Sequence, residues 1–200
     1  MAAARRAAGR RPVRPRARGG PGLRRRGSHL TGTTLAPVAR FHGRLWRQTA
    51  LRVPGCLPPE QPAPHPARYH RVGDPWPLYA SLDSETMWAE WAHATDGHVP
   101  PAEDPRWVCA LDVDLQMLDL RDPATRRALR ASRRSLSAPW SPDAPNAAAL
   151  RVAAAATRLG VDGLIVPSAA REGGWNAVIL PSAFERVHLR SRRRSVPPTG

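Results

Sequence analysis

The chain has 200 residues, and its 31 arginines against 16 acidic residues, with no lysine, give a formal net charge of +15. This length suits one domain of ordinary size plus a tail, and no apolar stretch approaches the ~18–20 residues of a membrane span. Residues 1–59 hold 14 arginines and no acidic residue, whereas residues 60–200 carry a net charge of only +1. The basic excess therefore says little about the partner of the folded part.

The N-terminal 38 residues are rich in Arg, Ala, Gly and Pro and show no apolar periodicity. This composition predicts a disordered arm, and the arm lacks the continuous apolar core of a secretory signal. A nucleic-acid-binding arm is the alternative interpretation, although it has few of the aromatic side chains that single-strand binders use. We expect a cytoplasmic protein without membrane contact, which meets nucleic acid only indirectly or through this arm.

The folded part is predicted to begin near Ala39 with a strand that has apolar anchors. Residues 54–66 contain six prolines and predict an irregular loop. A short buried strand at residues 78–81 then leads into a helix at residues 85–93. Glu90 lies beside the apolar face of this helix, so its carboxylate is placed to reach a cleft.

Further along the chain, strand patterns follow at residues 106–113, 115–120, 163–166, 176–180 and 184–189. We expect a turn near Asp114 between the first two strands, and a second basic tail at residues 191–200. An Ala-rich segment predicts a packing helix at residues 146–159, ended by a left-handed Gly160. The inner side of that helix is predicted to carry Leu150, Ala154 and Leu159. Because helices and strands mix without regular βαβ alternation, the pattern predicts one α+β domain at residues 39–190.

The two cysteines, Cys56 and Cys109, have no spacing typical of a metal or redox site. Cys109 lies in an apolar, strand-like run and is interpreted as a small core residue. The seven histidines form no ligand set with a nearby cysteine. We therefore expect no metal site.

Several polar side chains lie at the ends of predicted elements, where ligands often bind. A guanidinium offers paired donors to phosphate oxygens, which makes Arg47 and Arg68 candidates for holding a diphosphate. A carboxylate in a dry cleft stabilises positive charge on a ribose, and Glu90 is the candidate for that role. Plainer structural alternatives stay open, with Tyr79 as a core residue and Ser168 as a turn residue.

Taken in order, these segments resemble the RES domain, a family named for its Arg, Glu and Ser, over about residues 39–190. The specific part is the spacing of Arg68, Tyr79 and Glu90 at equal steps of about 11 residues, with Leu-Tyr-Ala-Ser around the tyrosine. The other matching positions are Arg47, Ser168 and Asn176. The chain departs from the usual family pattern at Gln48 and Ala67.

The resemblance implies a compact α+β domain with a mixed, mostly antiparallel sheet, related to ADP-ribosyltransferase toxins. It implies an enzyme that degrades NAD by cleaving the nicotinamide–ribose bond, with inorganic phosphate as co-substrate or water as acceptor, and with no bound cofactor. It also implies the toxin of a type II toxin–antitoxin pair, whose helix-turn-helix antitoxin blocks the site. The assembly would be a homodimer or a larger hetero-oligomer with that antitoxin.

Carried over onto this sequence, the resemblance implies that Glu90 stabilises the cationic ribose, and that Arg68 and Tyr79 complete the catalytic set. The implied substrate-binding residues are Arg47, Tyr69, Ser81, Ser168 and Asn176. Two other functions stay open as alternatives. One is transfer of ADP-ribose to a macromolecule, and the other is a weakly active binding protein whose basic arm attaches to nucleic acid.

Overall fold

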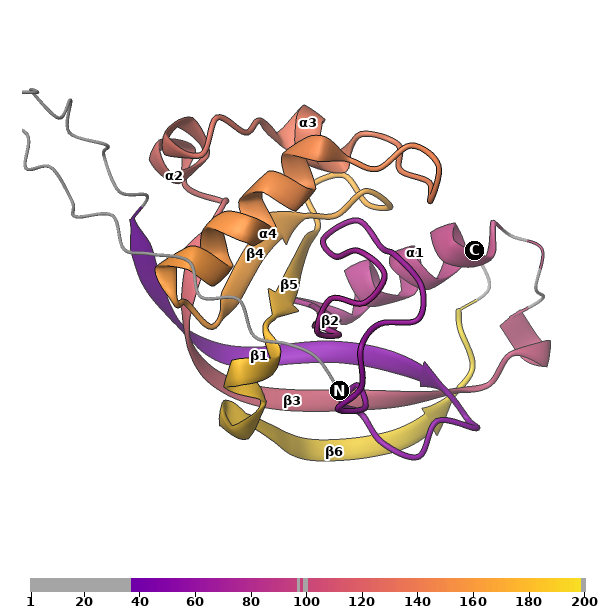
Figure 1. Cartoon of the computed structure of the whole chain (residues 1–200). Coiled ribbons are helices and arrows are strands. Elements are labelled where there is room, and N and C mark those ends of the chain that lie inside the picture. The colour runs from indigo at the N-terminus through magenta and orange to yellow at the C-terminus, as the bar shows by residue number, and fades with distance from the viewer. Residues whose placement is uncertain (1–36, 97, 99–100, 199–200) are drawn as a thin grey trace, which may run out of the picture. The chain divides into compact units, whose positions relative to one another are not determined.

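The structure is a computed structural model that describes residues 37–96, 98 and 101–198 (Figure 1). The arm expected at residues 1–38 therefore lies outside the described residues except for its last two, and Val38 already belongs to the first strand. Among the residues described, none of the helices is both long and apolar enough to cross a membrane.

Five strands pair into a closed ring, and they are β1 (Val38–Ala50), β2 (Leu78–Ser81), β3 (Arg106–Asp119), β4 (Gly163–Pro167) and β5 (Trp175–Ile179). β1 pairs with β2 and β3, β2 with β5, β5 with β4, and β4 with the end of β3. A sixth strand, β6 (Val187–Ser195), pairs with the first half of β3. Of the strand pairs in the described residues, only β3–β4 is parallel, which confirms the mixed, mostly antiparallel sheet.

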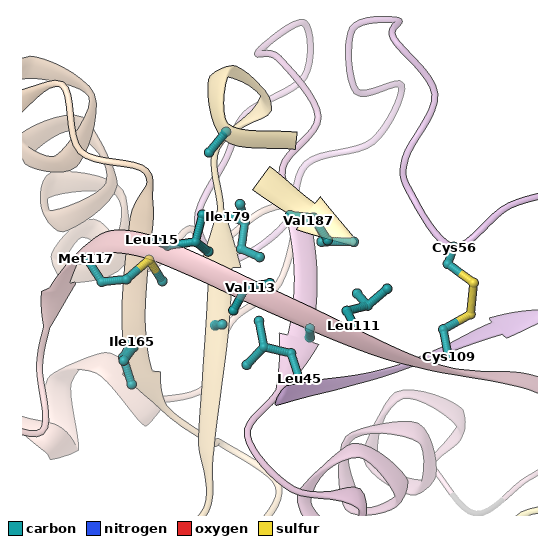
Figure 2. Packing of buried hydrophobic residues seen from close by; sticks show 14 residues of the cluster. Leu45, Cys56, Cys109, Leu111, Val113, Leu115, Met117, Ile165, Ile179 and Val187 are labelled. Carbon is teal, nitrogen blue, oxygen red and sulfur yellow. A yellow bond between two sulfur atoms is a disulfide. The ribbon is translucent and has the colours of Figure 1, made fainter. Parts of the chain in front are cut away.

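The main hydrophobic core is formed by one face of these strands (Figure 2). Leu111, Val113 and Leu115 alternate along β3 and are almost fully buried, because successive side chains of a strand point to opposite faces. Leu45 of β1 and Ile179 of β5 pack in the same cluster. The paired strands therefore form a rigid frame, and side chains at their ends have fixed positions.

The helices are α1 (Ser84–Thr95), α2 (Pro123–Ala128), α3 (Arg133–Ser137) and α4 (Ala147–Leu159), with the 3-10 helices η1 (Pro101–Glu103) and η2 (Pro181–Arg186). α3 and α4 pack on β4, whereas α1 packs on β1 and β2 (Figure 1). A second core cluster, which includes Tyr69, Leu136 and Val152, lies between the sheet and the helices α3 and α4. The helices expected at residues 85–93 and 146–159 and the α+β class are confirmed.

The turn expected near Asp114 is wrong, because β3 runs without interruption through this residue. Asp112 and Asp114 lie on the outer face of the strand, where they form ion pairs with Arg44 and Arg40 of β1. Alternation of these aspartates with buried apolar residues marks a half-exposed strand. Without knowledge of their arginine partners on β1, these aspartates give a polar pattern that is also typical of a turn.

The inner face expected for α4 is also wrong. The helix begins after its N-cap Asn146 and ends at Gly160, which has a φ of 64° as expected, but Ala154 and Leu159 are exposed and Leu150 is half-buried. The buried residues of this helix are Ala149, Val152, Ala155 and Ala156. Alanines carry little apolar signal, so packing against β4 decides the buried face rather than hydropathy.

The C-terminal strand begins and ends later than expected. Residues 184–186 belong to η2, and β6 runs from Val187 to Ser195, so residues 191–195 of the expected basic tail form a strand. Most side chains of β6 are exposed. An exposed strand of arginines shows no apolar alternation, which is why the sequence did not predict it.

The two cysteines form a disulfide, which the sequence did not predict (Figure 2). Cys109 is fully buried in the core as expected, and Cys56 joins it from the proline-rich loop 53 residues earlier in the chain. Spacing along the sequence does not reveal such a pair, because the fold alone brings the residues together. The disulfide ties the loop between β1 and β2 to β3. Within the described ranges, no cluster of three or more His, Cys, Asp or Glu side chains is arranged to hold a metal ion.

Candidate functional site

A hydrogen-bond network joins four of the predicted site residues. Glu90 Oε1 accepts hydrogen bonds from Ser168 Oγ and from Asn176 Nδ2, each at 2.6 Å. Asn176 Oδ1 in turn accepts from Ser81 Oγ at 2.7 Å. These side chains come from α1, β2, β5 and the loop after β4, so the network fixes the orientation of a half-buried carboxylate.

The Ser168 hydroxyl uses both its donor and its acceptor capacity in hydrogen bonds. Its oxygen accepts hydrogen bonds from the backbone N–H groups of Ala170 and Arg171 at 3.1 and 3.0 Å, so its own proton is donated to Glu90. A serine in this state orients a carboxylate and closes its own turn. It is not arranged as the nucleophile of a serine hydrolase, since two backbone N–H groups occupy its oxygen and no histidine contacts it in the described part of the chain.

The loop that carries Ser168 is clamped to the first turn of α1. Arg171 donates hydrogen bonds to Asp83, which caps α1, and to Thr86, and it forms an ion pair with Glu85. Gly174 lies so close to α1 that a Cβ there would meet Thr86 Oγ1 at 2.7 Å. The helix that presents Glu90 and the loop that presents Ser168 are therefore held against each other.

Arg47 is a half-buried cation with a fully buried Nε beside this network. Its Nη1 donates to the backbone carbonyl of Tyr79 at 2.8 Å, while its buried Nε has no partner. Among the described residues, none of the ion pairs includes Arg47, and burial lowers the pKa of its guanidinium to about 10. A buried guanidinium without a carboxylate partner is a favourable site for an anionic group of a ligand.

A cavity of about 280 Å³ brings these groups together. Its lining includes Arg47, Tyr79, Ser81, Glu90 and Asn176, with apolar surface from Trp46 and Met87. Such a volume is at the lower end for small-molecule sites and suits one part of a larger ligand. The cavity has a cation and an oriented carboxylate in its lining.

Gln48 also lines this cavity and is held in place. Its Oε1 accepts a hydrogen bond from Arg106 Nε at 2.7 Å, and Arg106 forms an ion pair with Asp104. Asp104 in turn accepts from Trp91 Nε1 of α1 at 2.9 Å. This departure from the usual family pattern therefore links the wall of the cavity to the helix that carries Glu90.

Tyr79, which lines the cavity, belongs to a cluster of three aromatic rings. The ring centroid of Tyr79 is 6.5 Å from that of Tyr69 and 5.8 Å from that of His70. His70 Nδ1 lies 2.9 Å from Tyr79 Oη, and His70 Nε2 lies 3.0 Å from the backbone oxygen of His65. Burial raises the pKa of both tyrosines and lowers that of His70. The buried Tyr69 hydroxyl has no partner among the described residues.

Arg68 is placed differently from the other candidates. Its Nη1 donates to the backbone oxygens of Leu136, at 3.0 Å, and of Ala138. It does not line the cavity that contains Glu90, although its positive charge acts on Tyr69 and Tyr79 and lowers the pKa of each against the larger effect of burial. Its direct contacts are thus with the C-terminal end of α3, and its expected catalytic role stays a prediction.

Sequence reasoning missed His70, Arg171 and Trp46 as parts of this site. His70 follows the Arg-Tyr pair of the motif, but nothing in the sequence shows that its ring meets the Tyr79 hydroxyl. Arg171 is one arginine among 31 basic residues, and only its contacts with α1 distinguish it. Trp46 precedes Arg47 in the motif, which is the one signal that pointed to it.

Comparison with known proteins gives the class that this fold and site define. Residues 37–198 match the model of the RES domain, and the chain belongs to the RES domain family. It is 35% identical over 167 residues to a Mycobacterium tuberculosis protein described as "Probable NAD(+) phosphorylase Rv3189", with 82% of this chain and 77% of that protein covered.

A solved structure shares the fold. A chain of the M. tuberculosis MbcT–MbcA toxin–antitoxin complex superimposes with a TM-score of 0.63 and 18% sequence identity, covering 80% of this chain and 87% of that chain. At this identity the likeness establishes the α+β fold. The roles of individual site residues rest on the geometry described above.

Proposed function

We propose that this protein cleaves the bond between nicotinamide and ribose in NAD. The observation that carries the proposal is the Glu90 carboxylate, which Ser168 and Asn176 hold in a cavity that Arg47 also lines. The relative described as a probable NAD(+) phosphorylase supports the same chemistry. NAD is the substrate, and the reaction requires no resident cofactor.

The chemistry explains why an oriented carboxylate is useful. Nicotinamide leaves as a neutral molecule, because the pair of electrons in the C1′–N bond neutralises the pyridinium ring. Positive charge then develops on the ribose, and a carboxylate fixed beforehand stabilises that charge without reorganisation. In this proposal Glu90 faces the ribose, while Asn176 and Ser81 hold Glu90 and shape the floor of the cavity.

The acceptor of the ADP-ribosyl group is inorganic phosphate or water. Arg47 supports an anionic group in the cavity, since its guanidinium is buried and has an unused Nε donor. A phosphate oxygen that forms a bond to C1′ gives ADP-ribose-1″-phosphate, and a water that does so gives ADP-ribose and a proton. The roles proposed for Arg68, Tyr69 and Tyr79 are to border the nicotinamide and phosphate ends of the substrate.

We further propose that the protein is the toxin of a type II toxin–antitoxin pair that acts on the cytoplasmic NAD pool. The chain with the same fold in the MbcT–MbcA toxin–antitoxin complex supports an antitoxin partner. That partner would carry a helix-turn-helix domain and cover the cavity, in a hetero-oligomer or on a toxin homodimer. Contact with nucleic acid would then be indirect, through the antitoxin or the basic arm.

The test is NAD consumption by the purified full chain, with and without inorganic phosphate, followed by product analysis. Loss of NAD to ADP-ribose-1″-phosphate would identify a phosphorylase, and loss to free ADP-ribose regardless of phosphate would identify a glycohydrolase. ADP-ribose attached to a protein or nucleic acid would instead favour the alternative function, transfer of ADP-ribose to a macromolecule. No loss of NAD from the folded protein would contradict the proposal.

A further inference from the structure

The hydrogen bonds of the buried His70 determine its tautomer. A backbone carbonyl can only accept a hydrogen bond, so His70 Nε2, at 3.0 Å from the His65 oxygen, must carry a proton. In the neutral ring Nδ1 is then without a proton and can only accept. The Tyr79 hydroxyl, 2.9 Å away, therefore donates its proton to His70 Nδ1.

The backbone around His70 is equally well fixed. His70 and Ala67 exchange two backbone hydrogen bonds, at 3.0 and 3.3 Å, and form an isolated bridge. Three and four residues further on, the chain is tied back by hydrogen bonds of Gly73 and Asp74 with Ala63. Only 5% of the His70 surface is exposed. The imidazole is thus a rigid support that reaches from the loop to β2.

Tyr79 is consequently anchored at both ends. Its backbone oxygen accepts from Arg47 Nη1, and its hydroxyl donates to His70 Nδ1. If the acceptor at His70 were lost, the proton of this partly buried hydroxyl would lack an acceptor, and such donors are costly to leave unpaired. The tyrosine ring would then turn, and the cavity wall and the anchor of Arg47 would change with it.

We propose that His70 is a positioning residue for NAD cleavage: its neutral Nδ1 accepts the Tyr79 hydroxyl proton and so holds the wall of the cavity that contains Arg47 and Glu90. The proposal rests on the proposed function for its kinetic effect, but the tautomer and the hydrogen bond do not depend on it. His70 touches neither the cavity nor, by this account, the substrate.

Protonation of His70 breaks this arrangement. A second ring proton on Nδ1 would face the Tyr79 proton, so the hydroxyl must rotate away. Burial lowers the pKa of His70, while the His65 carbonyl and the negative charge of Asp74 act in the opposite direction. Tyr79 contacts the ring, and the other titratable or charged groups that line a second cavity together with His70 are Tyr69, Arg71 and, from α4, Arg158. Activity should therefore decline on the acid side as His70 gains its proton.

Two substitutions separate the hydrogen bonds of the ring. His70→Asn keeps an acceptor at the position of Nδ1, and His70→Gln keeps a donor toward the His65 carbonyl but loses the acceptor for Tyr79. We expect kcat/KM to fall roughly ten- to hundredfold in His70→Gln at neutral pH, and to stay within about threefold of the wild type in His70→Asn. His70→Asn should also lose the acid-side decline. Equal activity of the two variants, or an unchanged acid side in His70→Asn, would overturn the proposal.

Nitrogen-15 NMR of the His70 ring in the full-length wild type provides a test without turnover. Near pH 7.5 we expect a protonated Nε2 and an unprotonated Nδ1. Tyr79→Phe removes the donor that stabilises the neutral ring, so it should raise the pKa of His70. A protonated Nδ1 in the wild type, or no change of pKa in Tyr79→Phe, would contradict the hydrogen bond. If the NMR results agree with these expectations but the wild type does not consume NAD, the hydrogen bond stands and only the proposed function is refuted.

Discussion

At the scale of single residues, the site combines a carboxylate that hydrogen bonds hold in place with a guanidinium that has an unused donor. Glu90 Oε1 takes two donors at 2.6 Å, so its direction is set before a ligand binds. Arg47 has one backbone partner and an unused, buried Nε. The first arrangement suits stabilisation of a developing cation, and the second suits capture of a phosphate.

Arg47 gives a prediction about alkaline pH. Burial lowers its pKa to about 10, so the charged guanidinium predominates below that pH and is lost above it. The KM for NAD should rise by about tenfold for each pH unit above that value. Arg47→Met should have a KM raised by at least about tenfold at pH 8, without a further rise toward pH 10.5. Initial rates measured from pH 8 to 10.5 give the KM of both proteins, and circular dichroism serves as the control for folding. The same dependence of KM on pH in the wild type and in Arg47→Met would refute the prediction.

At the scale of elements, the site depends on the contact between α1 and the loop after β4. Arg171 bridges to Asp83 and Thr86, and Gly174 lies against Thr86. The expected helix at residues 85–93 and the strands that flank the loop were predicted correctly from hydropathy. The contact between them was not, because the sequence pattern shows which face of an element is apolar but not which element covers it.

Gly174→Ala tests this contact. The added Cβ would approach Thr86 Oγ1 to 2.7 Å, so the loop must move and draw Ser168 and Asn176 away from Glu90. We expect kcat to fall at least about tenfold, because both donors to the carboxylate are disturbed. The control is Gly173→Asn, since Gly173 has open space around it and a φ of 75°, which asparagine tolerates. Equal kcat values for the two variants would show that the close approach is unimportant.

The disulfide gives a second prediction at this scale. Cys109 lies directly opposite Arg47 in the β1–β3 register, and its bond to Cys56 closes a loop with a sequence separation of 53. Loss of that cross-link should lower the free energy of unfolding by about 4 kcal/mol. Thermal unfolding of the oxidised protein with and without a dithiol reductant measures the effect. The Cys56→Ser, Cys109→Ser double variant should not respond to the reductant, and an unchanged melting temperature of the wild type would contradict the prediction.

At the scale of the whole molecule, the closed ring of strands explains what could be predicted and what could not. The spacing of Arg68, Tyr79 and Glu90 carried the resemblance to the family that the chain belongs to, and the class of fold followed from the order of elements. The chain did not reveal that Arg68 turns toward Leu136 and Ala138 rather than into the cavity. The disulfide and the exposed strand β6 were also not predicted from the sequence, because both depend on pairings between segments far apart in the chain.

The role proposed for Glu90 is to stabilise the cation formed when nicotinamide leaves NAD. The most direct measurement is nicotinamide release from NAD by the full-length wild type, by Glu90→Gln and by Glu172→Gln, in which an exposed glutamate outside the network is changed. The amide keeps the size of Glu90 but removes its charge, so we predict a loss of about 10²–10³-fold in kcat for Glu90→Gln. Glu172→Gln should match the wild type. Nicotinamide release by a folded Glu90→Gln at the wild-type rate would contradict the account.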